Sequence, residues 1–370
     1  MMRVPYVDLA AQHAPLRAEI LGAVGRVLDH GQFILGEEVS RFEQAFSQLI
    51  GTRYAVGLNS GTDALILALR ALEIQQGDEV ITAPNSFLAS ASCIAMLGCR
   101  PVFVDVREDL NLDPERLEPA ITGRTKAIIV VHLTGRPADM KPILEIARRH
   151  DLRIVEDAAQ SIGARYDGQP VGSFGDIGCF SLHPLKTLGA CGDAGVITTN
   201  DPVLAERVRT LRNVGLIARD NAVAWSGHSR LDTVQAAILL VKMNYWERWT
   251  EQRRANAWFY QRRLGDYVRV PVDRPCEYAV YHTFVIQAEN RDALQAFLEA
   301  RGVGTRVHYA LPIHRTTVGG TLGYGPGSLP VTERLADRIL SLPVYPELTQ
   351  TQLEHVAASI HEFYHGRRSM

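Results

Sequence analysis

The alternation of short apolar runs with helical stretches limits the possible folds of this chain more than any other feature of its sequence. Six runs rich in β-branched residues predict strands, at residues 78–82, 101–106, 126–133, 153–156, 177–182 and 195–199. Helical stretches lie between several of these runs, at residues 62–73, 87–97, 139–150 and 202–214. Strands that alternate with helices of about 10 to 15 residues predict βαβ units and a mostly parallel sheet.

The composition of the strands and the change of pattern after them predict the layers and the domains. Residues 128–131 (Ile-Ile-Val-Val) are apolar on both faces, as in a sheet that helices cover on both sides. The fold class is therefore α/β, a mostly parallel sheet sandwiched by helices. Near residue 234 an apolar run leads into a long helical stretch crowded with arginine and glutamate. We interpret this stretch as the link between a large domain (1–249) and a smaller α+β C-terminal domain (250–370).

Charge and cysteine content exclude several classes of protein. The 39 Lys and Arg residues nearly balance the 41 Asp and Glu residues, so no basic surface for nucleic acid is expected. The longest apolar runs are far shorter than the roughly 18 residues of a membrane span, and the first residues lack the apolar core of a signal peptide. The five cysteines form no C-x-x-C pair, which predicts free thiols in the cytoplasm.

The first polar cluster is Asn59-Ser60-Gly61-Thr62, which follows an apolar run and opens a helical stretch. Gly61 allows a close approach of the backbone to a ligand, and Ser60 or Thr62 can cap the helix. Free N–H groups at such a helix start suit a phosphate. An ordinary capped helix explains the same residues, so the cluster by itself leaves both interpretations open.

The second cluster places Asp157 at the end of an apolar strand, with Gln160 three residues later. Ligands of open α/β sheets bind at the carboxyl ends of strands, and one helical turn would point both side chains the same way. A helix-capping aspartate is the alternative interpretation of Asp157.

The third cluster carries one lysine between two apolar strands. A strand ends near Ser181, Pro184 forces a turn, and Lys186 follows between Leu185 and Leu188. A single lysine is usually a solvated surface residue. Partial burial among these leucines would lower the lysine pKa and make the amine a usable nucleophile.

Together the clusters match the requirements of pyridoxal 5'-phosphate (PLP), which needs a Schiff-base lysine, an acid beside its pyridine nitrogen and a phosphate cradle. Lys186, Asp157 and residues 60–62 supply these groups in turn. Gln160 is the candidate partner of the ring hydroxyl, and Ser181 is a further candidate for the cradle. Phe87 is the candidate for the aromatic ring that lies flat on the cofactor, with core packing as its alternative role.

Four motifs in order give the sequence a family resemblance. They are Ser-Gly-Thr-Asp-Ala-Leu (60–65), Glu-Asp-Ala-Ala-Gln (156–160), Phe-Ser-x-x-Pro-x-Lys (180–186) and Ser-Arg-Leu-Asp (229–232). This set resembles the DegT/StrS-type nucleotide-sugar aminotransferases, which are fold-type-I PLP enzymes, and the resemblance covers essentially the whole chain. It implies a PLP Schiff base on Lys186, L-glutamate as amino donor and a keto-sugar nucleotide as acceptor.

The resemblance also implies a homodimer with two shared active sites. The loop before residues 229–232 would reach the cofactor phosphate of the neighbouring subunit. The family usually has Asn in that loop, whereas this chain has His228, whose imidazole N–H can still donate to phosphate. His308, Tyr309 and His314 resemble a segment that lines the substrate cleft, and they are the substrate-contact candidates.

Two features near Lys186 refine the expected reaction. His183 precedes the lysine by three residues and is a candidate for proton transfer or substrate contact, with a structural role equally open. Residues 186–195 resemble the corresponding segment of members that act at sugar carbon 3, which favours a 3-keto sugar. Related dehydratases have His in place of the lysine, and Lys186 argues against that activity.

Three other functions are alternatives to a nucleotide-sugar aminotransferase. An aminotransferase acting on a keto-cyclitol or another non-nucleotide ketone would share the fold and the cofactor chemistry. A PLP-binding regulator without turnover is expected to carry a DNA-binding segment or a basic arm, and the first 25 residues show neither. The His-Glu-x-x-His pattern at 361–365 matches a zinc peptidase, but no third ligand follows it, so we interpret it as a chance match and expect no metal site.

A glycine-rich stretch at residues 319–327 interrupts the C-terminal part of the chain. Its five glycines predict a loop rather than regular structure. The loop is either a surface connection or a flap over a site.

Overall fold

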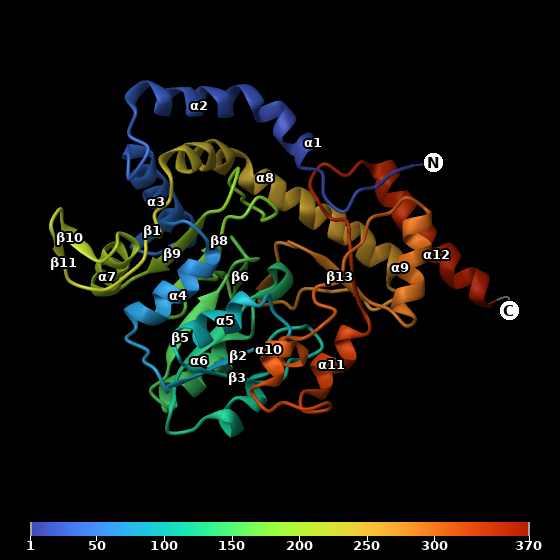
Figure 1. Cartoon of the computed structure of the whole chain (residues 1–370). Coiled ribbons are helices and arrows are strands. Elements are labelled where there is room, and N and C mark those ends of the chain that lie inside the picture. Colours follow the sequence, from blue (N-terminus) through green and yellow to red (C-terminus); the bar gives the residue numbers. More distant parts are fainter. Residues whose placement is uncertain (1, 369–370) are drawn as a thin grey trace.

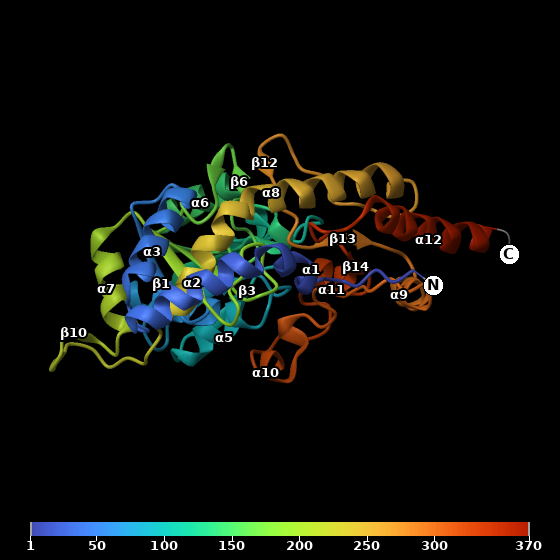
Figure 2. The same ribbon diagram turned by 90° about the horizontal axis from the view of Figure 1, so that it is seen from above.

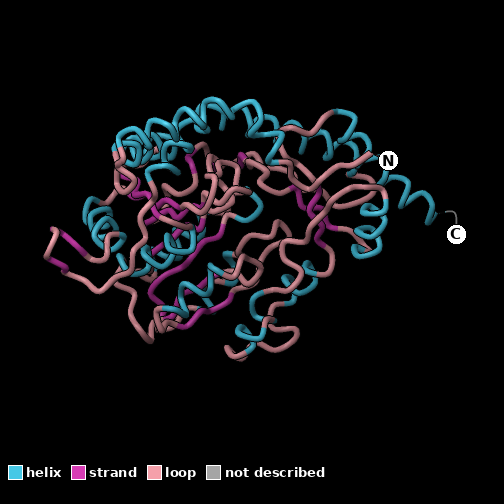
Figure 3. Tube along the Cα trace, turned by 45° about the horizontal axis from the view of Figure 1, so that its top comes forward, coloured by secondary structure: helices cyan, strands magenta, loops and turns pink. Residues whose placement is uncertain are grey.

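A seven-stranded sheet lies at the centre of the protein, whose computed structural model describes residues 2–368 (Figures 1 and 3). The strands follow the order β1 (Tyr54–Leu58), β9 (Gly195–Thr199), β8 (Ile177–Ser181), β5 (Arg153–Asp157), β4 (Thr125–Val131), β2 (Glu79–Thr82) and β3 (Arg100–Phe103). In this sheet β9 pairs antiparallel with both of its neighbours, whereas the other neighbouring strands pair in parallel. The predicted mostly parallel sheet is therefore confirmed.

Both faces of the sheet are buried, because alternate residues of a strand point to opposite faces. On β8, Cys179 packs into the cluster that contains Ala64 of α4 (Gly61–Ala71). Its neighbour Phe180 packs into a second cluster with α3 (Glu37–Ile50), where its ring centroid lies 5.1 Å from that of Phe46. Helices thus cover both sides, as predicted. The other helices that accompany the sheet are α5 (Ala89–Met96), α6 (Met140–Arg149) and α7 (Pro202–Arg212).

The predicted strands and helices are all present, with ends that shift by one to three residues. The strand at 195–199 has the predicted limits, and the helix predicted at 62–73 is observed at Gly61–Ala71. Strand β1 was identified in the sequence only as an apolar run. It is an edge strand whose partner, β9, lies far away in the sequence, so no local pattern indicated the pairing.

The long helix α8 (Thr233–Leu264) runs past residue 250 without a break (Figure 1). Its later half packs into a separate hydrophobic cluster with β13 (Phe284–Gln287), β14 (Ile339–Leu342), α9 (Arg291–Ala300) and α12 (Gln350–Arg368). Val4, near the other end of the chain, also belongs to this cluster. The division into domains 1–249 and 250–370 stays a prediction, and its boundary lies inside a continuous helix.

The glycine-rich stretch is not entirely loop, which corrects the prediction for residues 319–327. A short helix, α10 (Thr317–Gly320), includes its first two glycines, and the Thr316 hydroxyl caps this helix by accepting from the Gly319 N–H. The following residues lie against the edge strand β3, where the Tyr324 hydroxyl accepts from the Phe103 N–H at 2.8 Å. The stretch therefore covers a sheet edge that would otherwise be exposed.

The remaining elements lie around this frame, and Figure 2 shows them from above. A hairpin extends from the body beside α7 and is made of β10 (Leu216–Ala218) and β11 (Asn221–Ala222) (Figure 1). The other elements are α1 (Leu9–His13), α2 (Arg17–His30), β6 (Arg165–Tyr166), β7 (Gln169–Pro170), β12 (Glu277–Tyr278) and α11 (Pro330–Ala336). Among the helices described, none has the length and apolar character that crossing a membrane requires.

Candidate active site

A pocket of about 390 Å³ opens where β5 and β8 end and α4 begins. It brings together most of the residues that the sequence analysis selected. These are Ser60, Gly61, Thr62, Phe87, Asp157, Gln160, Ser181, His183, Lys186 and Tyr309. The carboxyl ends of neighbouring parallel strands meet at one edge of a sheet, which explains why distant clusters converge here.

The start of α4 forms one wall of this pocket. The Ser60 hydroxyl caps the helix by accepting from the Asp63 N–H at 3.1 Å, which leaves the N–H groups of Gly61 and Thr62 without partners inside the helix. A Cβ at Gly61 would lie 2.6 Å from the Cβ of Ser181, so only glycine allows the helix start to approach β8 this closely. Unpaired N–H groups at a helix start suit a phosphate.

The Asp157 carboxylate lies at the end of β5 and is held by two hydrogen bonds. Oδ2 accepts from the Ser90 hydroxyl at 2.7 Å, and Oδ1 accepts from the Ala159 N–H at 3.2 Å. Asp157 is buried, so its charge acts in a medium of low polarity. Ser90 lies on α5 and was missed by the sequence analysis, since no local pattern connects it to a residue 67 positions away.

Gln160 connects the sheet to the C-terminal part of the chain. Its side-chain oxygen accepts from the Thr134 N–H at 2.7 Å, and its side-chain nitrogen donates to the Tyr309 hydroxyl at 3.4 Å. Burial raises the pKa of Tyr309 to about 12, so its hydroxyl remains protonated at neutral pH. The Tyr309 ring centroid lies 6.4 Å from that of Phe87, which is largely exposed and is therefore not a core residue.

Lys186 lies in the turn that follows β8. The turn closes when the Lys186 N–H donates to the His183 carbonyl at 2.8 Å. Burial lowers the pKa of the lysine amine to about 8, although the nearby Asp157 carboxylate acts in the opposite direction. His183 is exposed at the pocket, and its Nδ1 accepts from the Leu185 N–H at 3.3 Å. The pKa of the amine thus lies close to neutral pH, where the amine can both take up and release a proton.

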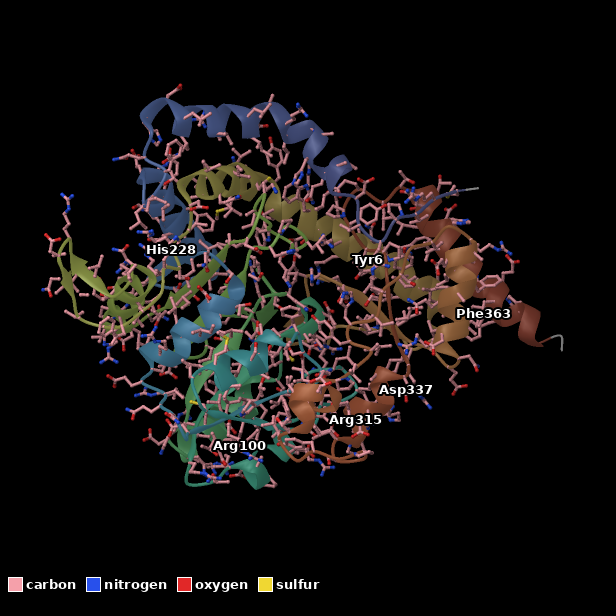
Figure 4. All side chains as sticks on the ribbon, in the orientation of Figure 1. Tyr6, Arg100, His228, Arg315, Asp337 and Phe363 are labelled. Carbon is pink, nitrogen blue, oxygen red and sulfur yellow. The ribbon has the colours of Figure 1, made fainter. Side chains whose placement is uncertain are left out.

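Three selected histidines do not line this pocket. His314 is fully buried, and its Nε2 pairs with Glu333 at 3.2 Å. The neighbouring Ile313 N–H donates to the Pro84 carbonyl at 2.8 Å and ties this segment to the loop after β2. His308 pairs through Nδ1 with the Ser341 hydroxyl at 2.9 Å and lines a smaller neighbouring pocket. His228 is exposed near the hairpin side of the molecule (Figure 4).

The two histidines of the 361–365 pattern both contact Tyr267. The His361 ring stacks on Tyr267 with centroids 4.4 Å apart, and its Nε2 pairs with the Arg263 carbonyl at 2.7 Å. His365 pairs through Nε2 with the Tyr267 hydroxyl at 2.8 Å. Within residues 2–368 no group of three or more His, Cys, Asp or Glu residues is placed to hold a metal ion.

The residues of the larger pocket fit pyridoxal phosphate by their chemistry. The pocket combines a lysine of lowered pKa, a buried carboxylate at a strand end and a helix start that only glycine allows to come so close to β8. Its volume is that of a small-molecule site. Fold and site together define the class of the protein, a fold-type-I PLP-dependent aminotransferase.

Comparison with known proteins gives the family. The model of the DegT/DnrJ/EryC1/StrS aminotransferase family matches residues 15–361, and the chain belongs to this family. A relative from Geobacillus stearothermophilus, named a pleiotropic regulatory protein, is 44% identical over 98% of this chain and 99% of its own. A UDP-N-acetyl-3-dehydro-alpha-D-glucosamine 3-aminotransferase from Acidithiobacillus ferrooxidans is 43% identical over 98% of both chains.

A solved structure agrees with the same assignment. The crystal structure of DesV from Streptomyces venezuelae in complex with a ketimine intermediate superposes with a TM-score of 0.96 at 43% identity. The match covers 98% of this chain and 99% of the DesV chain. The fold is therefore shared over essentially the whole length of both proteins.

Proposed function

We propose that this aminotransferase moves an amino group from L-glutamate to carbon 3 of a nucleotide-linked keto-sugar, in the biosynthesis of an amino deoxysugar. The observation that carries the proposal is the convergence of Lys186, Asp157 and the start of α4 in one pocket. The choice of acceptor is supported by the name of the Acidithiobacillus relative and by the resemblance of residues 186–195 to members that act at carbon 3.

Each residue of the pocket then has a proposed task. Bound PLP supplies the carbonyl that exchanges amino groups and the ring that withdraws electrons from the reacting carbon. The Lys186 amine takes the proton from the α-carbon of the donor, which its lowered pKa favours. Asp157 keeps a proton on the pyridine nitrogen, and Gln160 binds the ring hydroxyl. The phosphate is bound by Ser60, Gly61, Thr62 and Ser181.

The remaining candidates contact the substrate or the ring face. Phe87 covers the cofactor ring, and its exposed ring at the pocket supports this role. Tyr309 donates a hydrogen bond from its protonated hydroxyl to the sugar, while His183 assists proton transfer or contacts the substrate. For His308 we propose an indirect contribution through the neighbouring pocket. His314 is enclosed by protein and retains only a structural role in this proposal.

We further propose that two copies of the chain share their active sites. The β10–β11 hairpin extends from the body (Figure 1). Trp225, three residues after the hairpin, is 98% exposed. Phe33 and Leu35 add exposed apolar surface. His228 lies outside the pocket of its own chain, so a second copy is needed to bring it to a cofactor phosphate. A homodimer related by a two-fold axis would complete both sites at once.

A reducing compartment, the cytoplasm, fits the cysteines. All five are free thiols, and Cys191 is exposed. An exposed thiol persists as a thiol where the surroundings are reducing. We therefore propose that the enzyme acts in the cytoplasm.

A panel of acceptors tests the proposed reaction. The purified enzyme is incubated with PLP, L-glutamate and, in separate reactions, 3-keto sugar nucleotides, 4-keto sugar nucleotides or a keto-cyclitol. Mass spectrometry identifies the products. We expect an amino sugar nucleotide from the 3-keto substrates. Conversion of the cyclitol alone would replace the sugar-nucleotide proposal.

The name of the Geobacillus relative supports a second candidate function, a PLP-binding regulator. Such a protein would bind cofactor and amino donor without producing an aminated ketone. The same panel decides between the two, because a regulator yields no product with any acceptor while still responding to the amine.

A further inference from the structure

Lys186 lies in a segment without helix or strand, residues 182–194, which we call the lysine loop. Two backbone hydrogen bonds close its base. The Ala190 N–H donates to the Leu182 carbonyl at 2.7 Å, and the Leu182 N–H donates to the Ala194 carbonyl at 2.8 Å. Lys186 lies between these points, where the loop lines the candidate active-site pocket. The position of its amine therefore depends on the contacts that support the loop.

Gly189 connects the two halves of the lysine loop. A Cβ at this position would lie 2.7 Å from the Pro184 carbonyl oxygen and 2.8 Å from the His183 carbonyl oxygen, so its backbone packs directly on that turn. The same His183 carbonyl accepts from the Lys186 N–H and closes the turn that carries the lysine. A displacement of Gly189 would therefore displace the turn and the Lys186 side chain with it.

Lys242, on the long helix α8, holds Gly189 in place. Its Nζ donates to the Gly189 carbonyl at 2.6 Å, and the residue is only 2% exposed. Within residues 2–368 this amine pairs with no carboxylate, and burial lowers its pKa although the neighbouring Cys191 side chain acts in the opposite direction. A buried charge without an opposite charge reduces stability. An apolar side chain of similar length would fill the same space at lower cost, so what the amine adds here is its bond to the lysine loop.

Gln235 holds the same loop from a position two helical turns earlier on α8. Seven residues separate Gln235 from Lys242, which puts both side chains on one face of the helix. The Gln235 side-chain oxygen accepts from the Cys191 N–H at 2.9 Å, and its side-chain nitrogen donates to the Cys191 carbonyl at 3.2 Å. A Cβ at Gly192 would lie 2.9 Å from that nitrogen, so the amide fits closely against the loop. We call Gln235 and Lys242 the loop clamp.

We propose that the loop clamp positions Lys186 for the transfer of the amino group. Neither clamp residue lines the candidate active-site pocket, so both act through the lysine loop and are positioning residues. Helix α8 suits this task because its Leu239 packs in one buried cluster with Leu188 and Ala190 of the loop. The inference rests on the proposed function only in the role that the function gives to Lys186.

A loosened loop would change the lysine in two measurable ways. Burial lowers the pKa of Lys186 to about 8, so water that reaches the amine would return this pKa toward the ordinary value of about 10.4. The amine would also spend less time where it can remove a proton from the donor, which slows the reaction. The walls that bind the donor are left unchanged, so the affinity for L-glutamate should change little.

Gln235→Leu and Lys242→Met test the clamp, since each keeps the approximate size of the side chain and removes its bonds to the loop. The apoenzyme of each variant is labelled with trace acetic anhydride at a series of pH values, and mass spectrometry of the Lys186 peptide gives the pKa of its amine. We expect this pKa to rise from about 8 to about 9 or higher in both variants. With PLP bound, the maximal rate with L-glutamate, followed by cofactor absorbance, should fall roughly tenfold or more. The half-saturating concentration of L-glutamate should stay within about threefold.

Two more variants separate positioning from folding. Gln252→Leu makes the same substitution at an exposed position of α8 and should leave the pKa of Lys186 and the rate with L-glutamate unchanged. Gln235→Glu keeps an oxygen that can accept from the Cys191 N–H and should recover part of the rate that Gln235→Leu loses. Because Gln235 is only half-buried, Gln235→Leu keeps the test decisive if Lys242→Met does not fold.

The outcomes distinguish this inference from the proposed function. A pKa of Lys186 that stays near 8 in the clamp variants would overturn the positioning role, even if these variants react slowly. The labelling needs no cofactor, donor or acceptor. A raised pKa together with the slower rate would therefore support the clamp even if no keto-sugar nucleotide is aminated, and only the proposed acceptor would then be wrong.

Discussion

The chemistry of single residues in this protein depends on how far each one is removed from water. Burial lowers the pKa of Lys186 to about 8 and raises that of Tyr309 to about 12. The same physical cause thus favours a neutral base and a permanent hydrogen-bond donor in the walls of one pocket. Asp157 is buried as well, but two hydrogen-bond donors stabilise its carboxylate.

The lowered pKa of Lys186 predicts how the apoenzyme captures PLP. Only the neutral amine attacks the cofactor aldehyde, so the capture rate should rise with pH and level off above about 8. At pH 7 roughly a tenth of the amines are neutral, against fewer than one in about a thousand for an ordinary lysine. Stopped-flow absorbance after adding PLP measures this rate. Lys186→Ala should give no lysine-linked absorbance at any pH, and an inflection near pH 10 in the wild type would contradict the prediction.

The charge of Asp157 is open to a separate test. Asp157→Asn keeps the shape but removes the charge that favours a protonated pyridine ring, so turnover should fall roughly 100-fold or more. The cofactor should remain linked to Lys186, as its absorbance will show. Ser90→Ala removes only one hydrogen bond from the carboxylate and should cost no more than about tenfold. Equal kcat values for Asp157→Asn and the wild type would remove Asp157 from the mechanism.

At the scale of elements, the site depends on a buried anchor, the carboxylate of Glu156. Glu156, next to Asp157 on β5, is fully buried and accepts from the N–H groups of Gly172, Phe174 and Gly175 at 2.6 to 2.8 Å. It also pairs with Nε2 of His132 at 3.0 Å, while Nδ1 of that ring accepts from the Ala138 N–H. One carboxylate thus fixes the end of β5 to the loop at 172–175 and to the end of β4.

Removal of this anchor should weaken the fold rather than a chemical step. Glu156→Ala leaves several buried donors without a partner and should lower the free energy of unfolding by roughly 3 to 5 kcal/mol. Urea denaturation followed by circular dichroism measures this loss. Glu145→Ala, on the exposed side of α6, is the matched control and should stay within about 0.5 kcal/mol of the wild type. Similar unfolding midpoints for the two variants would show that Glu156 does not stabilise the fold in this way.

At the scale of the whole molecule, the pocket is assembled from distant parts of the chain, and one expected cofactor-binding residue, His228, lies outside it. Selected residues between Ser60 and Asp193 form its walls together with Tyr309, whereas His228 lies exposed elsewhere (Figure 4). The proposed dimer accounts for this separation, because the residue that is missing from one copy would come from the other.

Mixed dimers test this arrangement. Lys186→Ala and His228→Asp should each be inactive alone, the second because its carboxylate repels the cofactor phosphate. If the sites are shared, a mixed dimer has one site with both mutations and one intact site. Half the dimers are mixed after random exchange, so about a quarter of the wild-type activity should return. Subunits are mixed in dilute urea and assayed after refolding, and activity that stays at zero would argue that each site belongs to one chain.

Much of the fold was predictable because it is encoded locally. The alternation of strands and helices predicted the sheet and its layers, and β9 has the limits expected from its sequence. Pairings between distant segments were not predictable in this way, as the missed strand β1 and the short helix α10 show. Helix α10 forms in spite of its glycines because Thr316 caps it and the body of the protein holds it in place.

The sequence by itself determined the family, the expected cofactor and most members of the pocket, because those residues follow strand ends and helix starts that local patterns reveal. The tertiary structure alone decided burial and partners. It buried His314 inside the protein and placed Ser90 against Asp157. The physical reason is that burial and hydrogen bonding depend on contacts between residues far apart in the chain, which no local pattern records.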